Sequence, residues 1–402
     1  MKILVVLPRF PFPLEKGDKL RAYHQIRTLA ADNEVYLFAA THTAVSDADI
    51  EQMRRYCKAI KVVRLSRLYG LLRVVRNFFG SRSLQIGYWD ARKAKQALRQ
   101  FERQVCPDVV YSQMVRTMKY VSASPYPKVM DFQDALSMNL ERRMMNRRGL
   151  AYFALHYEFK MLRSAEYNAF GIFDALTIIS EPDSEAIPQR KDSVIHIIPN
   201  GVDFDYFKPI DNPKKYDVVF CGNMQYKPNI NAARFLVLDI MPLVWQRYPE
   251  ARVLIAGATP TAAVRQLAGA RVDVSGSVDD IRPCYASSRL FVAPMRIGSG
   301  LQNKLLEAMA MGIPCITTPI ANASLAATPG THLLQGQDAP QLAQAIITLL
   351  GDQALCQRLA ASATAFVHER FSWESAGRQL QQVLQQAIET YAHNERIELE
   401  DE

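Results

Sequence analysis

Short apolar runs alternate with longer amphipathic stretches along the whole chain. The runs are rich in β-branched residues and show no regular alternation with polar ones, which is typical of strands covered on both faces. The stretches between them have helical spacing, so the pattern predicts βαβ units and parallel sheets. Strands are expected near residues 3–7, 34–40, 59–65, 108–113, 127–132, 174–180 and 194–200, and then near 218–222, 252–257, 271–276, 289–294 and 313–318.

A passage rich in Pro, Asp and Lys at 207–217 (FKPIDNPKKYD) interrupts this pattern before it starts again. The interruption predicts two α/β domains, residues 1–198 and 199–371. Apolar residues recur at helical spacing in RQLQQVLQQAIETY, so residues 372–394 are expected to form an amphipathic helix. Open α/β sheets bind ligands beyond the carboxyl ends of their strands, and we therefore look for functional residues there.

The composition is that of an ordinary globular protein, with 49% hydrophobic and 22% charged residues among 402. The apolar runs stop well short of the roughly 20 residues that a membrane-spanning helix needs. The opening MKILVVLPRF has the pattern of a strand and a loop, not of a signal peptide, so we expect a cytoplasmic protein. The six cysteines form no CxxC pair, which favours reduced thiols and gives no support to a zinc site.

Positive charge is concentrated in the first half of the chain. Residues 1–200 hold 31 Lys and Arg against 20 Asp and Glu, whereas residues 201–402 hold 17 against 20. The excess suggests an anionic partner for the first half, although a generally basic surface would give the same count. The segment 65–82 sets arginines among Leu, Val and Phe, and 139–149 adds a second basic cluster. Such a segment can lie on an anionic membrane or pack its apolar face on the sheet. We expect no nucleic acid partner, because no RNA- or DNA-binding motif is present.

The segment APMRIGSGLQNKLLEAMAMGIPCITT (293–318) carries the strongest chemical signal. A strand ends in a glycine-rich turn, and a helix is expected from Leu301 to Met311. The amides at such a helix start suit a phosphate, and Arg296 and Lys304 can add two cations. Glu307 lies in an apolar setting, where a carboxylate is costly unless it is paired; it can bind a ribose diol or form a surface ion pair with Lys304. The turn itself is made of Gly298, Ser299 and Gly300.

At these residues the chain resembles the family 4 retaining glycosyltransferases of the GT-B fold. Their donor-binding domain carries an E-x7-E pair ending in LEAMA-x-G-x-P. Here LEAMAMGIP is intact, and Glu307 matches the second glutamate, which binds the ribose in that family. Ser299 replaces the first glutamate, which lies near the donor sugar. The segment is also similar to glycosyltransferases of exosortase and exopolysaccharide gene clusters, in which a lysine, here Lys304, contributes to the phosphate site.

The resemblance implies two Rossmann-like domains that face each other across a cleft, with the C-terminal helix packing back on the first domain. The first domain would bind the acceptor and the second the nucleotide-sugar donor. In the second domain, Asn223 takes the place of a family arginine after the first strand, and Lys227 lies near the place of a family lysine. Val278, in a G-x-V loop, would lie against the nucleobase. The same loop can instead be ordinary, with Asp279 or Asp280 capping the next helix.

In the first domain the resemblance points to two loops. The glycine loop of GT-B enzymes corresponds to Gly17, where Lys19 and Arg21 are candidate phosphate or acceptor contacts; a solvated basic helix start is the alternative. After the strand at 127–132, Gln133 stands where family members commonly have a histidine. We assign Asp131, Gln133 and Asp134 to catalysis, the alternative being that Asp134 or Ser137 caps the next helix. The family's front-face mechanism tolerates the loss of a histidine base, because the leaving phosphate oxygen takes the acceptor's proton.

The sequence therefore predicts a retaining glycosyltransferase. It would move a hexose from a UDP- or GDP-sugar to a glycan or lipid-linked acceptor, without a cofactor and without a metal, since no DxD-type carboxylate pair occurs in the donor segment. One rival is a nucleotide-sugar epimerase of the same fold, which should need more acid–base residues. The other is a non-catalytic sugar- or partner-binding subunit, favoured by Ser299, Asn223 and Gln133. A nicotinamide dehydrogenase is disfavoured, because no strand runs into GxGxxG.

Overall fold

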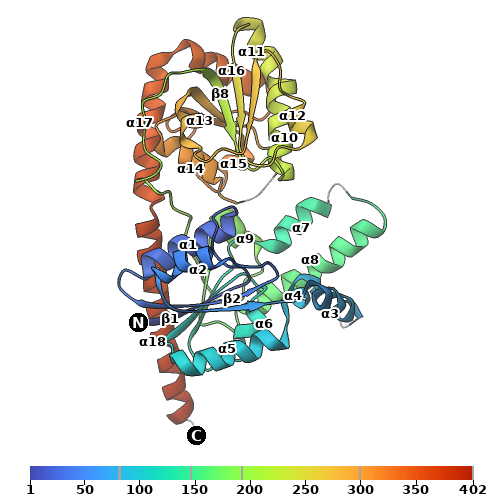
Figure 1. Cartoon of the computed structure of the whole chain (residues 1–402), viewed down its shortest axis with the longest axis vertical. Helices are drawn as coiled ribbons and strands as arrows, with labels where there is room; N and C mark the ends of the chain where they lie inside the picture. The colour runs from blue at the N-terminus through green and yellow to red at the C-terminus, as the bar shows by residue number, and fades with distance from the viewer. Residues whose placement is uncertain (80–82, 145–146, 192, 298–299, 401–402) are drawn as a thin grey trace. The chain divides into compact units, whose positions relative to one another are not determined.

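The computed structural model describes residues 1–79, 83–144, 147–191, 193–297 and 300–400. The chain divides into two compact units: Met1–Pro199 together with Trp373–Glu402, and Asn200–Ser372 (Figure 1). These boundaries lie one residue from the expected ones. Each unit is built on its own parallel sheet, so the expected α/β class is confirmed.

The first unit contains a seven-stranded sheet in the order β3-β2-β1-β4-β5-β6-β7. All its described pairings are parallel, as the uninterrupted apolar runs predict. Its strands are β1 (Lys2–Leu7), β2 (Glu34–Thr41), β3 (Cys57–Arg64), β4 (Val109–Gln113), β5 (Lys128–Asp131), β6 (Ala175–Ile178) and β7 (Ile195–Ile197). Its helices are α1 (Gly17–Leu29), α2 (Asp47–Arg54), α3 (Arg67–Phe79), α4 (Leu84–Trp89), α5 (Arg92–Val105), α6 (Met118–Val121), α7 (Leu136–Met144), α8 (Leu150–Ala169), α9 (Glu181–Ala186) and α18 (Trp373–Glu400).

Successive residues of β1 point to opposite faces of this sheet and so build two separate cores. Ile3, Val5 and Leu7 pack with apolar residues of α1, α2 and α18. Leu4 and Val6 face the opposite core, to which α4, α5, α6 and α8 contribute. Figure 1 shows helices on both sides of the sheet. Burial on both faces explains why the sequence of this strand has no polar alternation.

The C-terminal helix α18 packs on α1 within the first unit, as the resemblance implied. The ring of Trp373 stacks on His24 with 4.5 Å between centroids, and Trp373 is 2% exposed. At Gly377 a Cβ atom would lie 2.1 Å from the Thr28 side chain, so the two helices meet closely at a residue without a side chain. The helix is therefore part of the first unit although it follows the second in sequence.

The second unit contains a six-stranded parallel sheet in the order β10-β9-β8-β11-β12-β13. Its strands are β8 (Tyr216–Cys221), β9 (Val253–Ala256), β10 (Val272–Gly276), β11 (Ser288–Ala293), β12 (Cys315–Thr317) and β13 (Leu334–Gln335). Its helices are α10 (Lys227–Phe235), the π-helix η1 (Leu236–Ile240), α11 (Met241–Arg247), α12 (Ala262–Arg265), α13 (Arg282–Ala286), α14 (Asn303–Ala310), α15 (Pro319–Asn322), α16 (Ala339–Gly351) and α17 (Gln353–Arg370).

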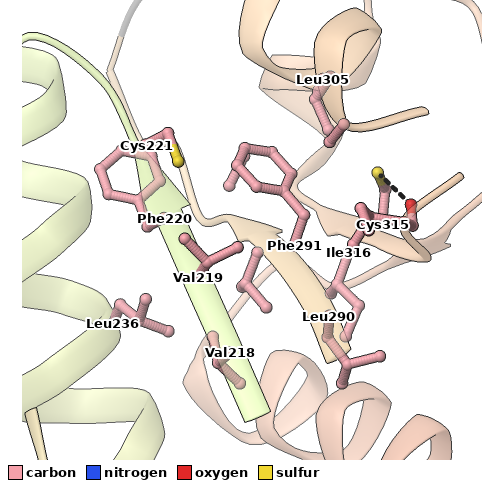
Figure 2. Packing of buried hydrophobic residues seen from close by; sticks show 14 of the residues in the cluster. Val218, Val219, Phe220, Cys221, Leu236, Leu290, Phe291, Leu305, Cys315 and Ile316 are labelled. Atoms are coloured by element: carbon pink, nitrogen blue, oxygen red, sulfur yellow. Dashed lines mark hydrogen bonds between the residues drawn. The ribbon is translucent and has the colours of Figure 1, made fainter. Parts of the chain in front are cut away.

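One continuous core fills the second unit. Figure 2 shows Val219 and Phe220 of β8 beside Leu290 and Phe291 of β11, with Leu305 of α14 above them. Leu305 is fully buried, and α14 packs against β11 and β12. This packing fixes the start of α14, where the sequence predicts the donor phosphates.

Three details differ from expectation or add to it. The two-residue strand β13 was not expected, because so short a run leaves no periodic signal. The helix expected at 301–311 begins at Asn303, and Gly312 ends it with φ +68°. All six cysteines are free; the apolar runs around several of them favour burial, but Cys106 is exposed and Cys356 is half-buried. Among the described helices, none has the length and apolar character to cross a bilayer.

Candidate active site

The second sheet reverses its strand order at β8, and this reversal locates a ligand crevice. The chain passes from β8 outward through β9 to β10, and then returns to the other side of β8 at β11. In open α/β sheets such a switch point leaves a crevice beyond the carboxyl ends of the two strands. The loop after β11 is held by Thr318, whose hydroxyl donates to the Met295 carbonyl at 2.6 Å. The crevice therefore has a fixed wall that leads into α14.

Lys304, in the first turn of α14, reaches across this crevice to the other central strand. Its Nζ donates to Oδ1 of Asn229 at 2.7 Å and lies 5.3 Å from the Phe220 ring centroid. Asn229 is held in turn, because its Nδ2 donates to the Asn223 carbonyl at 2.9 Å. Burial lowers the pKa of Lys304 to about 8. Among the described residues its hydrogen bonds go to neutral groups, the Asn229 amide and the Met295 sulfur, and the nearby Glu307 carboxylate only partly offsets the effect of burial. A desolvated ammonium in this setting favours the arrival of an anion.

Glu307 lies one turn further along α14 and is hydrogen-bonded to α13. Its Oε2 accepts a hydrogen bond from the Tyr285 hydroxyl at 2.8 Å. Among the described residues it forms no ion pair with Lys304, so the surface ion pair considered from the sequence is wrong. Burial raises the pKa of Glu307. Its second oxygen, Oε1, accepts no hydrogen bond from the described residues and is free for a ligand hydroxyl.

Three contacts that the sequence did not reveal support these residues. Asn200 donates from Nδ2 to Oδ1 of Asn303 at 3.2 Å, which ties the segment between the sheets to the first residue of α14. Asn229 and Tyr285 are the partners of Lys304 and Glu307, although they lie 75 and 22 residues away in sequence. No local pattern marks such distant pairs, and an asparagine in a first helical turn reads as an ordinary cap.

The other residues predicted to bind the nucleotide-sugar differ in their exposure and in the contacts that hold them. Arg296 is exposed, donates to Asn231 Oδ1 at 3.1 Å and lies over the Phe235 ring at 4.0 Å. Gly300 is buried with φ +81°, a conformation that glycine adopts at little cost. The remaining exposed residues are Asn223 in the loop after β8, Lys227 at the start of α10 and Val278 in the loop after β10. Gly298 and Ser299 lie outside the described residues.

An acidic residue shapes the loop of Val278, although the N-cap of α13 is Ile281 and not Asp279 or Asp280, as the alternative proposed. Asp280 accepts from the backbone N–H of Arg282 at 2.9 Å and from the Tyr206 hydroxyl at 3.0 Å. Hydrogen bonds from the Arg282 guanidinium hold the pKa of Asp280 down at about 2. Asp280 is therefore occupied within the loop, and Val278 is left 38% exposed beside it.

The first sheet has its own switch point between β1 and β4, and a buried ion pair lies there. Arg21 donates from Nε to Asp131 Oδ2 at 2.6 Å and from Nη2 to Asp131 Oδ1 at 3.2 Å. Their side chains are 1% and 0% exposed. Arg21 also donates to the Ile198 carbonyl at 2.9 Å. This geometry corrects both predictions: Arg21 is an internal partner of Asp131 and does not face an acceptor, and Asp131 has no surface from which to act on one.

Gln133 belongs to a buried chain of polar side chains that extends from this ion pair. Its Nε2 donates to Gln113 Oε1 at 2.9 Å, and Gln113 donates to Gln25 Oε1 at 2.6 Å. Its backbone N–H donates to Asp131 Oδ1 at 3.1 Å, and its φ is +64°. A non-glycine residue in this conformation is held by its surroundings and is often functional. Gln133 also lines a small hollow with Arg9, Asp18 and Lys19.

Asp134 differs from its neighbours because the described residues give its carboxylate no hydrogen bond or ion pair. The first amides of α7 are bonded by Asp183, which accepts from Ala135 N at 3.2 Å, and by Glu166, which accepts from Ser137 N at 3.0 Å. The capping role proposed for Asp134 or Ser137 is therefore wrong. Burial and the nearby Asp183 raise the pKa of Asp134 to about 7.

A cleft of about 350 Å³ opens next to this hollow and shares Arg9 with it. Its walls are apolar side chains of α3 and α4, and two arginines line it as well. Arg116 donates to Gln85 Oε1 at 3.0 Å, and burial lowers the pKa of its guanidinium to about 10. The cleft combines cations with an apolar wall. Gly17, by contrast, is exposed, with no other atom close to it.

The arrangement of two parallel-sheet units defines the GT-B class of glycosyltransferase folds. Sucrose-phosphate synthase from Thermosynechococcus elongatus superposes with a TM-score of 0.71 at 15% identity, covering 96% of this chain and 99% of that one. Anabaena HepE in complex with UDP superposes with a TM-score of 0.68 at 14% identity, covering 96% of this chain and all of HepE. The GT-B fold expected from the sequence is thereby confirmed.

The sequence comparisons find similarity to glycosyltransferases in the second unit. Residues 215–352 match the family model "Glycosyl transferases group 1". Over 92% of its length the chain is 22% identical to an uncharacterized 44.6 kDa protein in the cps region of Klebsiella pneumoniae, covering 96% of that protein. It is 30% identical to the phosphatidyl-myo-inositol mannosyltransferase of Mycobacterium tuberculosis over 46% of this chain and 52% of that enzyme.

Proposed function

We propose that the protein is a retaining glycosyltransferase that moves a hexose from a nucleoside diphosphate sugar to a glycan or lipid-linked acceptor. The observation that carries this proposal is Lys304 at the start of α14, a half-buried cation that forms no ion pair within the part of the chain that the structure describes. The diphosphate would bind Lys304, Arg296 and the first amides of the helix. The ribose diol would donate to Oε1 of Glu307. Structures of HepE with UDP and with UDP-glucose support a nucleotide-sugar donor.

The departure of the nucleoside diphosphate is the step that these cations would assist. As the bond from the anomeric carbon to the β-phosphate oxygen breaks, negative charge develops on that oxygen, and fixed positive charge stabilises it. Lys304 and Arg296 would do this without a metal ion. In the proposed retaining mechanism, the same oxygen takes the proton of the attacking hydroxyl on the same face of the sugar. No cofactor enters this sequence.

Asp134 is the residue of the first unit that best suits contact with the acceptor. Its pKa of about 7 lies near the working pH, where a carboxylate is an efficient hydrogen-bond acceptor and base. We assign Asp134 the role of orienting the acceptor hydroxyl. Asp131 and Arg21 become positioning residues, and Gln133 borders the hollow beside them.

The acceptor's chemistry is proposed from the cleft that holds Arg9 and Arg116. A diphosphate would meet the two arginines and an aliphatic chain the apolar wall, which fits a lipid-linked acceptor at the inner face of the membrane. The cps-region relative and the mannosyltransferases named for phosphatidylinositol acceptors support a role in surface polysaccharide or glycolipid synthesis. Incubating the protein with radiolabelled UDP- and GDP-sugars and membrane extract tests the proposal; binding without transfer would favour a non-catalytic subunit.

Replacing Lys304 with methionine should weaken nucleoside diphosphate binding about 10- to 100-fold, which is the loss of one charge-assisted hydrogen bond. The folded state should not suffer, because a half-buried ammonium is exchanged for an apolar chain of similar length. Calorimetric titration with UDP and GDP measures the affinity.

Lys214→Met is the matched control. That ammonium binds two backbone carbonyls, at 2.8 and 2.9 Å, so its loss should lower stability and leave the affinity unchanged. Equal affinities for wild type and Lys304→Met would contradict the assignment.

Nucleotide affinity should decline as the pH rises above 8. The pKa of Lys304 is lowered to about 8, so its binding-competent ammonium form is lost through that range. Affinity should be nearly flat from pH 7 to 7.5 and fall by up to about tenfold per pH unit beyond 8.5. Titrations in buffers from pH 7 to 9.5 provide the profile, with Lys304→Met as the reference. A wild-type profile parallel to that of the variant would exclude Lys304 as the titrating group.

A further inference from the structure

Helix α3 packs on the first unit through its polar and small residues. Asn77 is 5% exposed and lies against Gly87 of α4, where a Cβ would be 1.5 Å from its Nδ2. Gly70 lies against Tyr88, whose ring would be 2.6 Å from an added Cβ. Arg73 donates to the Tyr88 carbonyl at 3.0 Å. Among the described side chains, Gly70, Arg73 and Asn77 thus form the contact of α3 with α4, and the small Gly70 and Gly87 explain why the two helices lie so close.

The apolar stripe of α3 faces the opposite way, toward solvent. Leu68, Leu71, Leu72 and Val75 recur at the spacing of one helical face, and each is between 57% and 67% exposed. A surface helix normally buries such a stripe. The alternative from the sequence, that this apolar face packs on the sheet, is therefore wrong. A contiguous exposed apolar surface of this kind marks an interaction site.

The charges around the stripe select the partner. Arg67 and Arg76 are exposed and, at 100° per residue, flank the stripe on opposite sides. Residues 52–89 contain nine Lys and Arg and no Asp or Glu. A second copy of the chain would bring two such cationic segments together, which like-charge repulsion opposes. On an anionic lipid surface the leucines can enter the acyl region, and the arginines can bind the lipid phosphates.

We propose that α3 is a membrane-docking helix that lies in the headgroup region of an anionic bilayer. Leu68, Leu72 and Val75 enter the acyl boundary, and Arg67 and Arg76 extend outward to lipid phosphates. A second apolar pair adds to the contact. Leu150 and Phe153 of α8 are 89% and 67% exposed, and α8 is joined to α3 by the hydrogen bond from the Tyr157 hydroxyl to the Asn77 carbonyl.

Flotation of the full-length protein with vesicles tests this proposal without any substrate, so its outcome is independent of the proposed transfer reaction. Wild type should float with vesicles of phosphatidylcholine and phosphatidylglycerol, bind much less to pure phosphatidylcholine, and dissociate as NaCl rises from 0.1 to 0.5 M. Leu68→Gln/Leu72→Gln should lower binding at least tenfold. Arg67→Gln/Arg76→Gln should lower it about 25-fold, at about fivefold for each arginine near the surface.

Two control variants remove similar side chains elsewhere. Leu238→Gln changes a leucine that is 51% exposed in the second unit, and Arg358→Gln/Arg378→Gln removes two exposed arginines of α17 and α18; both should bind like wild type. Thermal melting should be unchanged in all variants, because the altered side chains are exposed. Wild type that stays unbound, or binding that the leucine pair does not alter, would overturn the proposal. A dimer in solution that the leucine pair abolishes would overturn it in favour of self-association.

Discussion

Arg21→Met is expected to destabilise the first unit by about 3–5 kcal/mol, the cost of leaving a buried charge without its partner. The Asp131 carboxylate is completely buried and takes two hydrogen bonds from the Arg21 guanidinium. After the substitution it would keep the Tyr111 hydroxyl at 3.0 Å and the Gln133 amide but no positive charge. The Ile198 carbonyl would also lose its donor. Urea unfolding followed by circular dichroism measures the change.

A surface ion pair in the same unit provides the control. Arg54 and Glu51 are each 67% exposed and 3.2 Å apart, so Arg54→Met should change stability by less than about 1 kcal/mol. Arg21→Met/Asp131→Asn should recover part of the loss, because the remaining amide carries no charge. If Arg21→Met were as stable as Arg54→Met, the ion pair would not hold the first unit together.

Asp134→Asn should lower the rate of transfer about 100-fold or more while leaving nucleotide affinity unchanged. The carboxylate is the group assigned to orient the acceptor hydroxyl, and a misplacement of about 1 Å of a reacting group can cost about 10² in rate. The nucleotide residues lie in the other unit and are untouched. Transfer of labelled sugar and calorimetric titration separate the two effects. The exposed Asp32 provides the control, since Asp32→Asn should affect neither.

The same substitution should raise stability at pH 8 and not at pH 4. The pKa of Asp134 is raised to about 7, so the folded protein holds this proton more tightly than the unfolded chain and loses stability as the pH rises from about 4 to 7. Asparagine removes that loss, which we put at about 2 kcal/mol because the side chain keeps some solvent exposure. Melting temperatures at the two pH values measure it. A variant that is less stable at pH 8, or retains full transfer activity, would refute the role of Asp134.

The sheets could be predicted from the sequence because a strand buried on both faces is an uninterrupted apolar run. Of the thirteen strands in the described part of the chain, twelve follow apolar runs, and the two-residue β13 left no pattern. Lys304 and Glu307 could be found for a similar reason, since turn and helix are contiguous in sequence. Their partners, Asn229 and Tyr285, could not be predicted in this way. Asn229 is 75 residues from Lys304, and only the sheet order brings the two together.

The first unit shows the limits of local patterns most clearly. Asp131, Gln133 and Asp134 are close in sequence and all polar, yet one is in an internal ion pair, one is in a buried amide chain and one is unpaired. Arg21, 110 residues from Asp131, makes that difference. The orientation of α3 is a similar case. Its amphipathic pattern could be predicted, but which face is buried depends on the fit of Gly70 and Asn77 against α4.

A crystal structure of the protein with UDP or GDP tests the central claim most directly. The account predicts the diphosphate within hydrogen-bond distance of Lys304 Nζ and the first amides of α14, with the ribose hydroxyls at Glu307 Oε1. The bond from Lys304 to Asn229 should lengthen or break as the phosphate takes its place. A nucleotide bound away from the carboxyl ends of β8 and β11, with Lys304 still bonded only to Asn229, would contradict the account.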